Sequence, residues 1–129
     1  MRFIVTLAAV ALVAGCAMQP AYEKGRYLVM RSELTSNIVI QMDLQSAGVT
    51  DMKPELCGFM LNMVRLSESK GKLFSCTFQG TPDLKAVVRM PVDGADKPML
   101  VEFRDLATCR EYARDSKTTT LKEADCQAK

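Results

Sequence analysis

Four cysteines constrain the fold of this 129-residue chain more than any other feature. They stand at Cys57, Cys76, Cys109 and Cys126, so the steps between them are 19, 33 and 17 residues. Four-cysteine zinc sites use close pairs, usually two to four residues apart, and this spacing does not supply them. In a small exported chain, an even number of cysteines predicts a disulfide framework. We therefore predict two disulfides and no metal site, provided that the chain is exported.

The first sixteen residues indicate export. Arg2 is followed by 13 uncharged and mostly apolar residues, 3 to 15. A membrane-spanning helix needs roughly 20 such residues, whereas the apolar region of a signal peptide is this short. The run ends in Val13-Ala14-Gly15-Cys16, which resembles the lipobox of bacterial lipoproteins. The resemblance implies a signal peptide over residues 1–15 and a lipidated Cys16. The alternative, an ordinary signal peptide cut after Ala17, leaves Cys16 unexplained.

The same resemblance implies a location. In Gram-negative lipoproteins an Asp after the lipidated cysteine favours retention in the inner membrane, and this chain has Ala17 there. We therefore expect palmitate-type acyl chains at Cys16 to hold the protein in the outer membrane, facing the periplasm. Two or three acyl chains anchor durably, since each buried methylene contributes about 0.8 kcal/mol. Residues 16–25 would be the lipidated cysteine and a short tether, and residues 26–129 one domain.

A repeated pattern favours one of the three possible disulfide pairings. A strand-like segment, a helix that begins after an Asp and carries one cysteine, and a further strand-like segment with a second cysteine occur twice in succession. The two helices would follow Asp51 and Asp105, which are good capping residues. On this pattern Cys57 pairs with Cys76, and Cys109 pairs with Cys126. Each loop of roughly 20 residues would contribute about 3 kcal/mol.

Residue patterns predict an α+β domain with a mostly antiparallel sheet and two helices packed on one face. The first helix should run from about Met52 to Ser69, with Pro54 in its first turn. The second should run from Leu106 to about Asp115. Strands rich in β-branched and apolar residues are predicted at 26–32, 37–44, 72–78, 86–90, 99–104 and 121–126, with a hairpin turn at Asp93-Gly94. A ferredoxin-like arrangement of residues 37–126 is one candidate topology.

The apolar residues of the first predicted helix follow a helical repeat. The repeat, at intervals of three and four residues, consists of Leu56, Phe59, Met60, Met63 and either Leu66 or Ser67. Such a repeat is typical of the face of a helix that packs on the core. Leu61 and Val64 widen the repeat. We therefore expect this helix to be largely buried.

Composition excludes several functions. The formal charge is only +2 with the basic residues scattered, so we expect no nucleic-acid partner. The chain has no His, the commonest general base and metal ligand. Ser67 and Lys70 match the S-x-x-K pattern, but its partner motifs are absent and a solvated helix end explains them. The loop from Asp93 to Asp96 lacks the ligand ladder of a calcium site.

These observations favour a non-catalytic envelope lipoprotein. It would act by binding a protein partner near the membrane, as an accessory of an assembly or secretion machine or as an inhibitor, and would need no cofactor. The alternative is a periplasmic binder of a small molecule or of copper, with a pocket between helix and sheet. Met60 and Met63, one helical turn apart, are the candidate Cu(I) ligands, although flexible apolar packing in the core is the favoured explanation for them.

Overall fold

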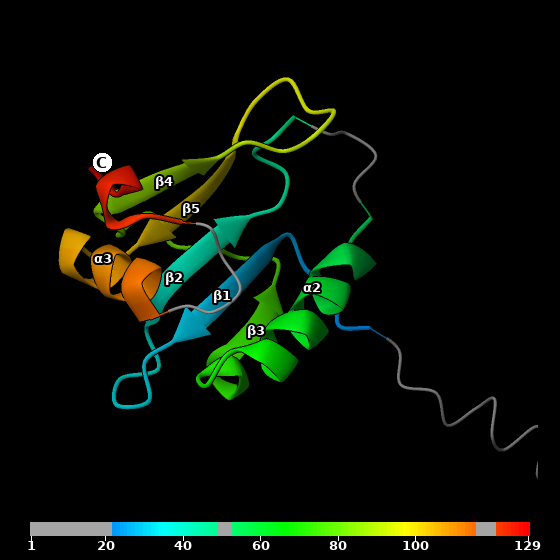
Figure 1. Ribbon diagram of the computed structural model, residues 1–129. Helices are drawn as coiled ribbons and strands as arrows, with labels where there is room; N and C mark the ends of the chain where they lie inside the picture. Colours follow the sequence, from blue (N-terminus) through cyan, green and yellow to red (C-terminus); the bar gives the residue numbers. More distant parts are fainter. Residues whose placement is uncertain (1–21, 49–52, 116–120) are drawn as a thin grey trace, which may run out of the picture.

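The computed structural model describes residues 22–48, 53–115 and 121–129. Cys16 and residues 17–21 of the predicted tether lie outside this range, as does the predicted helix cap Asp51. Six strands form one sheet, with two α-helices and two short 3-10 helices (Figure 1). The elements in chain order are β1 Tyr27–Arg31, β2 Ile38–Asp43, α2 Glu55–Ser67, η1 Gly71–Leu73, β3 Phe74–Thr77, β4 Ala86–Met90, β5 Met99–Phe103, α3 Leu106–Asp115, η2 Glu123–Asp125 and β6 Gln127–Ala128.

The strands pair in the order β3-β1-β2-β5-β4-β6, and every pair is antiparallel. Leu28 of β1 pairs with Met42 of β2, and Ile40 of β2 pairs with Phe103 of β5. Because side chains alternate between the two faces of a strand, all four of these side chains lie on the same face. The predicted turn at Asp93-Gly94 joins β4 to β5, and Gly94 adopts the positive φ of 77° that favours glycine.

Both helices pack on that same face, over opposite halves of the sheet (Figure 1). α2 contacts β1 and β3, and α3 contacts β4, β5 and η2. Disulfides Cys57–Cys76 and Cys109–Cys126 join the helices to β3 and to the segment just before β6. The α+β class, the antiparallel sheet and both predicted disulfides are therefore confirmed.

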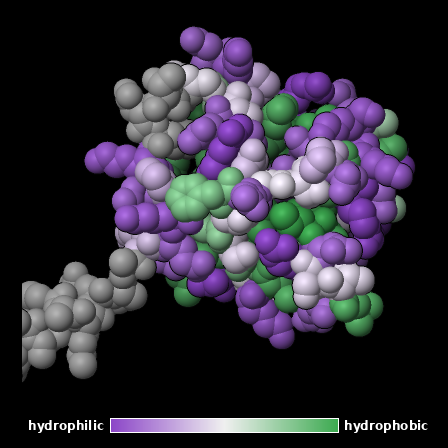
Figure 2. Space-filling view, turned by 180° about the vertical axis from the view of Figure 1, so that it is seen from behind, coloured by the Kyte–Doolittle hydropathy of each residue, from purple (hydrophilic) through white to green (hydrophobic). Residues whose placement is uncertain are grey.

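The opposite face of the sheet is covered by the segment between β3 and β4. Leu84 of this segment is buried, as are Val29, Val39 and Val87 on the strands beneath it. Gln41 is the single polar residue among the buried ones described. Its side-chain amide forms hydrogen bonds with the backbone N–H and the backbone carbonyl of Thr81. Seen from behind, hydrophobic side chains gather near the middle of the view, with hydrophilic ones around them (Figure 2). Each face of the sheet is thus covered in part, one by the two helices and the other by the segment between β3 and β4.

Two topological expectations are wrong. The predicted strand over residues 121–126 contains η2, and the short strand β6 begins only after Cys126. The ferredoxin-like arrangement of residues 37–126 is not formed, because β1 precedes that range and lies between β2 and β3. Two-residue β6 is too short to be visible as an alternating pattern in sequence.

The expectation that the first helix is largely buried is also wrong. α2 exists as expected, but its buried residues are Cys57, Gly58 and Leu61, while Phe59, Met63 and Leu66 are exposed. Cys57 must face β3 to reach Cys76, and this bond fixes the rotation of the helix about its axis. The helix therefore packs with the face that carries Cys57 and Leu61. Of the residues predicted to face the core, Leu61 is buried, whereas Phe59, Met63 and Leu66 are exposed.

Candidate functional site

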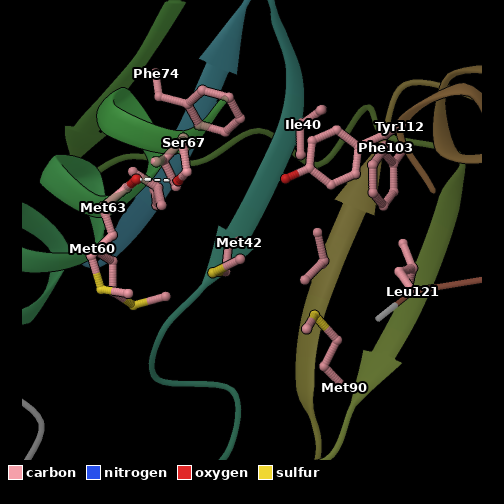
Figure 3. A pocket seen from close by; sticks show the side chains of 13 residues that line it. Ile40, Met42, Met60, Met63, Ser67, Phe74, Met90, Phe103, Tyr112 and Leu121 are labelled. Carbon is pink, nitrogen blue, oxygen red and sulfur yellow. Dashed lines mark hydrogen bonds between the residues drawn. The ribbon is translucent and has the colours of Figure 1, made fainter. Parts of the chain in front are cut away.

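An apolar groove lies between α2 and α3, over the middle of the sheet. Its volume is about 330 Å³, and none of its lining residues is charged. The floor comes from the strands, and the sides come from the two helices and from Leu121 (Figure 3). The lining residues are Leu28, Ile40, Met42, Met60, Met63, Val64, Ser67, Phe74, Met90, Val101, Phe103, Tyr112 and Leu121.

The two disulfides explain why the helices leave this space open. β3 and β6 are the outermost strands of the sheet. Cys57 and Cys109 are fully buried, and each is bonded towards one of these edges, with Cα atoms 6.0 Å apart in both bonds. A disulfide holds its two Cα atoms within about 7 Å, so neither helix can move far towards the centre of the sheet. The middle strands therefore contribute apolar side chains to a groove rather than to a closed core.

Four methionines line the groove from three different elements. Met60 and Met63 come from α2, Met42 from β2 and Met90 from β4 (Figure 3). Methionine is unbranched and polarizable, so a surface of this kind adapts to apolar ligands of different shape. Thioethers are also ligands that suit Cu(I). The groove thus contains the predicted pair Met60 and Met63 together with Met42 and Met90, which the sequence analysis did not connect with that pair.

The polar groups of the groove belong to Ser67 and Tyr112. The Ser67 hydroxyl donates to the Met63 carbonyl within α2, so it acts in the helix end (Figure 3). The Tyr112 ring packs on Phe103, with ring centroids 5.8 Å apart. Ser67 is the last residue of α2, so the S-x-x-K sequence stands at the end of this helix.

A smaller polar hollow of about 140 Å³ continues the groove. It shares Ile40, Phe74 and Tyr112 with the groove, which makes the two spaces neighbours. Its charged residues are Lys70 and three acidic residues, Glu68, Glu111 and Asp115. The site as a whole is therefore an apolar channel with one polar, mainly acidic end.

The other candidate sites are weaker. Two depressions on the opposite face contain three cationic side chains. Arg104 pairs with Asp105 at 3.3 Å, Lys129 pairs with Glu102 at 2.7 Å, and Arg31 donates to the Ser36 carbonyl at 3.1 Å. Over residues 22–48, 53–115 and 121–129, no group of three or more metal-ligating His, Cys, Asp or Glu side chains occurs. In the same part of the chain, no helix is long and apolar enough to cross a bilayer.

None of the protein-family models, curated proteins and solved structures compared with this chain matches it.

Sequence reasoning placed a possible pocket between helix and sheet, but it did not identify the lining. Ile40 and Met42 stand on β2, Met90 stands on β4, and Tyr112 stands on the second helix. In the amino-acid sequence, residues that line a groove cannot be distinguished from core residues, because both are apolar and face inward from a strand or helix. The alternation of Ile38, Ile40 and Met42 was the one available signal that these residues share a face.

Proposed function

We propose that this protein is a non-catalytic, lipid-anchored protein of the bacterial envelope, and that it binds the acyl chain of an amphiphilic ligand in the groove between α2 and α3. The single observation that carries this proposal is the apolar, uncharged lining of a concave space of about 330 Å³. Small-molecule sites are clefts of roughly 300–1,000 Å³ with mainly apolar walls and few polar groups. Each ligand methylene moved from water into such a space contributes about 0.8 kcal/mol.

The polar end of the groove supports a particular class of head group. The neighbouring hollow contains three acidic residues and one lysine, so its formal charge is −2. An anionic head group placed there would be repelled, whereas a neutral or cationic one would not. The ligand class that fits both ends of the site is a single-chain amphiphile with a neutral or cationic head.

A protein partner, which the sequence favoured, is a different occupant of the same groove. A partner would insert a few apolar side chains into it, as the central residues of protein interfaces do. The groove favours an acyl chain because it is enclosed on two sides by helices and continues from an apolar part into a polar one. The experiment below separates the two occupants, since a protein-binding groove need not retain a free amphiphile.

The test compares three ligands with the same twelve-carbon chain and different heads. Residues 17–129, exported behind a cleavable signal peptide, would be titrated by calorimetry with glycerol monolaurate, dodecylamine and laurate, all below their aggregation concentrations. We expect saturable binding of the first two and weaker binding of laurate. Absence of saturable binding for all three would contradict the acyl-chain proposal and leave the protein partner as the better account.

Variants of the groove sharpen this test. Met42→Gln places a polar side chain on the floor of the groove and should weaken amphiphile binding by tenfold or more, since about 1.4 kcal/mol corresponds to a factor of ten. Leu66→Gln is the matched control, because Leu66 is 90% exposed and does not line the groove. This control should bind as the parent protein does.

Copper is a second candidate ligand, favoured by the four thioethers in one groove. Leucine substitutions distinguish it from an amphiphile. Met42→Leu together with Met60→Leu keeps the lining apolar but removes two sulfur ligands. Amphiphile binding should survive this change, whereas binding of Cu(I), measured by competition with a chromogenic chelator, should be lost if copper is the ligand.

The lipid anchor and the location are tested separately by mass. The mature chain from Cys16 has 129 minus 15, or 114, residues. The intact protein extracted from membranes should have the mass of these residues plus three acyl chains. Four thiols should become available to alkylation only after reduction. A mature chain without lipid, or one that begins elsewhere, would contradict the anchor.

A further inference from the structure

The exposed face of α2 carries a stripe of large apolar side chains. Phe59, Met63 and Leu66 lie at positions i, i+4 and i+7, and these residues are 49%, 56% and 90% exposed. This spacing places them on one side of the helix. Tyr22, 48% exposed, packs edge-on against Phe59 with ring centroids 6.3 Å apart. These four residues, termed here the α2 stripe, are four of the six exposed large hydrophobic residues among those described.

The chain enters the domain beside α2, the helix that carries this stripe (Figure 1). Backbone contact fixes the entry, because a Cβ atom placed on Gly58 of α2 would lie 2.4 Å from the Glu23 carbonyl oxygen. Two ion pairs reinforce the contact, Glu23 with Arg65 at 3.3 Å and Lys24 with Glu55 at 3.7 Å. The direction from which the chain arrives is therefore set by the surface of α2.

We infer that the α2 stripe docks on the surface of the membrane that holds the lipid anchor. This inference rests on the proposed lipidation of Cys16. From Cys16 to Tyr22 there are six residues, which span at most roughly 22 Å even when fully extended. Because the tether is this short and Tyr22 is part of the stripe, the face of the domain nearest the anchor is the one that carries the stripe.

The chemistry of this face suits a lipid surface. An amphipathic helix lies in the membrane interface with its apolar side buried by about 5–10 Å, and aromatic residues favour this depth. The surrounding charges do not oppose it. Residues 22–25 and 53–72 contain five basic and three acidic side chains, so their formal charge is +2. The stripe alone would bind weakly, but the anchor holds it at high local concentration beside the bilayer.

Tryptophan fluorescence tests the orientation, because the chain contains no Trp. The full-length chain would be expressed, purified from membranes in its lipidated form and reconstituted into phosphatidylcholine vesicles with and without brominated acyl chains. Phe59→Trp and Leu66→Trp should emit at shorter wavelength than a solvent-exposed Trp, and brominated lipid should quench both. Leu66→Trp is the second reporter because Leu66 is almost fully exposed, so the substitution leaves the packing intact.

Ala107→Trp is the matched control, on the exposed side of α3 over the other half of the sheet. Its emission should be that of a Trp in water, with no quenching by brominated lipid. The inference is overturned if the α2 reporters match this control while the protein stays bound to vesicles. A chain that never reaches the membrane fraction would overturn the lipid anchor as well, and the two failures are distinguished by where the protein is found.

Discussion

At the scale of single residues, Asp105 determines where α3 begins. Its carboxylate accepts hydrogen bonds from the Thr108 backbone N–H at 2.7 Å and from the Thr108 hydroxyl at 2.8 Å. The backbone bond is the main reason that the pKa of Asp105 is lowered from its ordinary value of 3.8, with the Thr108 hydroxyl and the Arg104 charge acting in the same direction. Asp105 thus fills the capping role that the sequence predicted for it.

This pKa shift gives a pH-dependent prediction. Because the pKa is lower in the folded state, the cap stabilises the protein above pH 3.8, and this contribution is lost as the pH falls through the folded value. Asp105→Ala should lower the free energy of unfolding by about 1 kcal/mol at pH 7, with a smaller effect below pH 3.8. Asp105→Asn keeps the acceptor without the titration and is the control. Urea denaturation across this pH range measures both, and a constant difference between Asp105 and Ala would contradict the prediction.

Gln41 is the residue that fastens the covering segment on the opposite face. Its Oε1 accepts from the Thr81 N–H at 2.7 Å, and its Nε2 donates to the Thr81 carbonyl at 3.3 Å. Gln41→Met keeps the size of the side chain but leaves the Thr81 N–H and carbonyl without their Gln41 partners. It should therefore lower the free energy of unfolding by about 1–3 kcal/mol. Gln45→Met, at an exposed position, should change it by less than about 0.5 kcal/mol. Equal effects in urea denaturation would show that the Gln41 bonds contribute nothing.

At the scale of elements, the disulfides connect each helix to an edge of the sheet. Their loops of 19 and 17 residues are nearly equal, so each bond should contribute a similar amount, about 3 kcal/mol. Replacing both members of a pair by Ala should therefore lower the free energy of unfolding by that amount in either case. Urea denaturation of Cys57→Ala with Cys76→Ala, and of Cys109→Ala with Cys126→Ala, measures this. A pair whose removal leaves stability unchanged would contradict its assigned structural role.

Most elements could be predicted from sequence, while the rotation of α2 could not. β4 and α3 match their predicted bounds, because their patterns and the Asp105 cap are local signals. In α2, two apolar faces compete, one with Phe59, Met63 and Leu66 and one with Cys57 and Leu61. The disulfide from Cys57 to Cys76 determines which face packs on the sheet, and Cys76 is 19 residues away in the chain. Disulfide pairing thus carried information that helical periodicity alone did not.

At the scale of the whole molecule, the groove and the α2 stripe meet at Met63. This residue lines the groove and also belongs to the exposed stripe. If both proposals hold, the groove opens beside the membrane surface, and an acyl chain reaches it without crossing water. A pocket between helix and sheet could be expected from the sequence, but its lining and shape could not, because they depend on how far apart two disulfides hold two helices over one sheet.

Methionine methyl NMR tests the acyl-chain groove most directly. Residues 17–129 labelled with ¹³C-methyl methionine, with signals assigned by single Met→Leu variants, would be titrated with glycerol monolaurate. We predict that Met42, Met60, Met63 and Met90 shift together along one saturation curve, while Met99, which does not line the groove, shifts least. Unchanged methyl signals at the four groove positions, or a shift of Met99 equal to theirs, would contradict the proposed site.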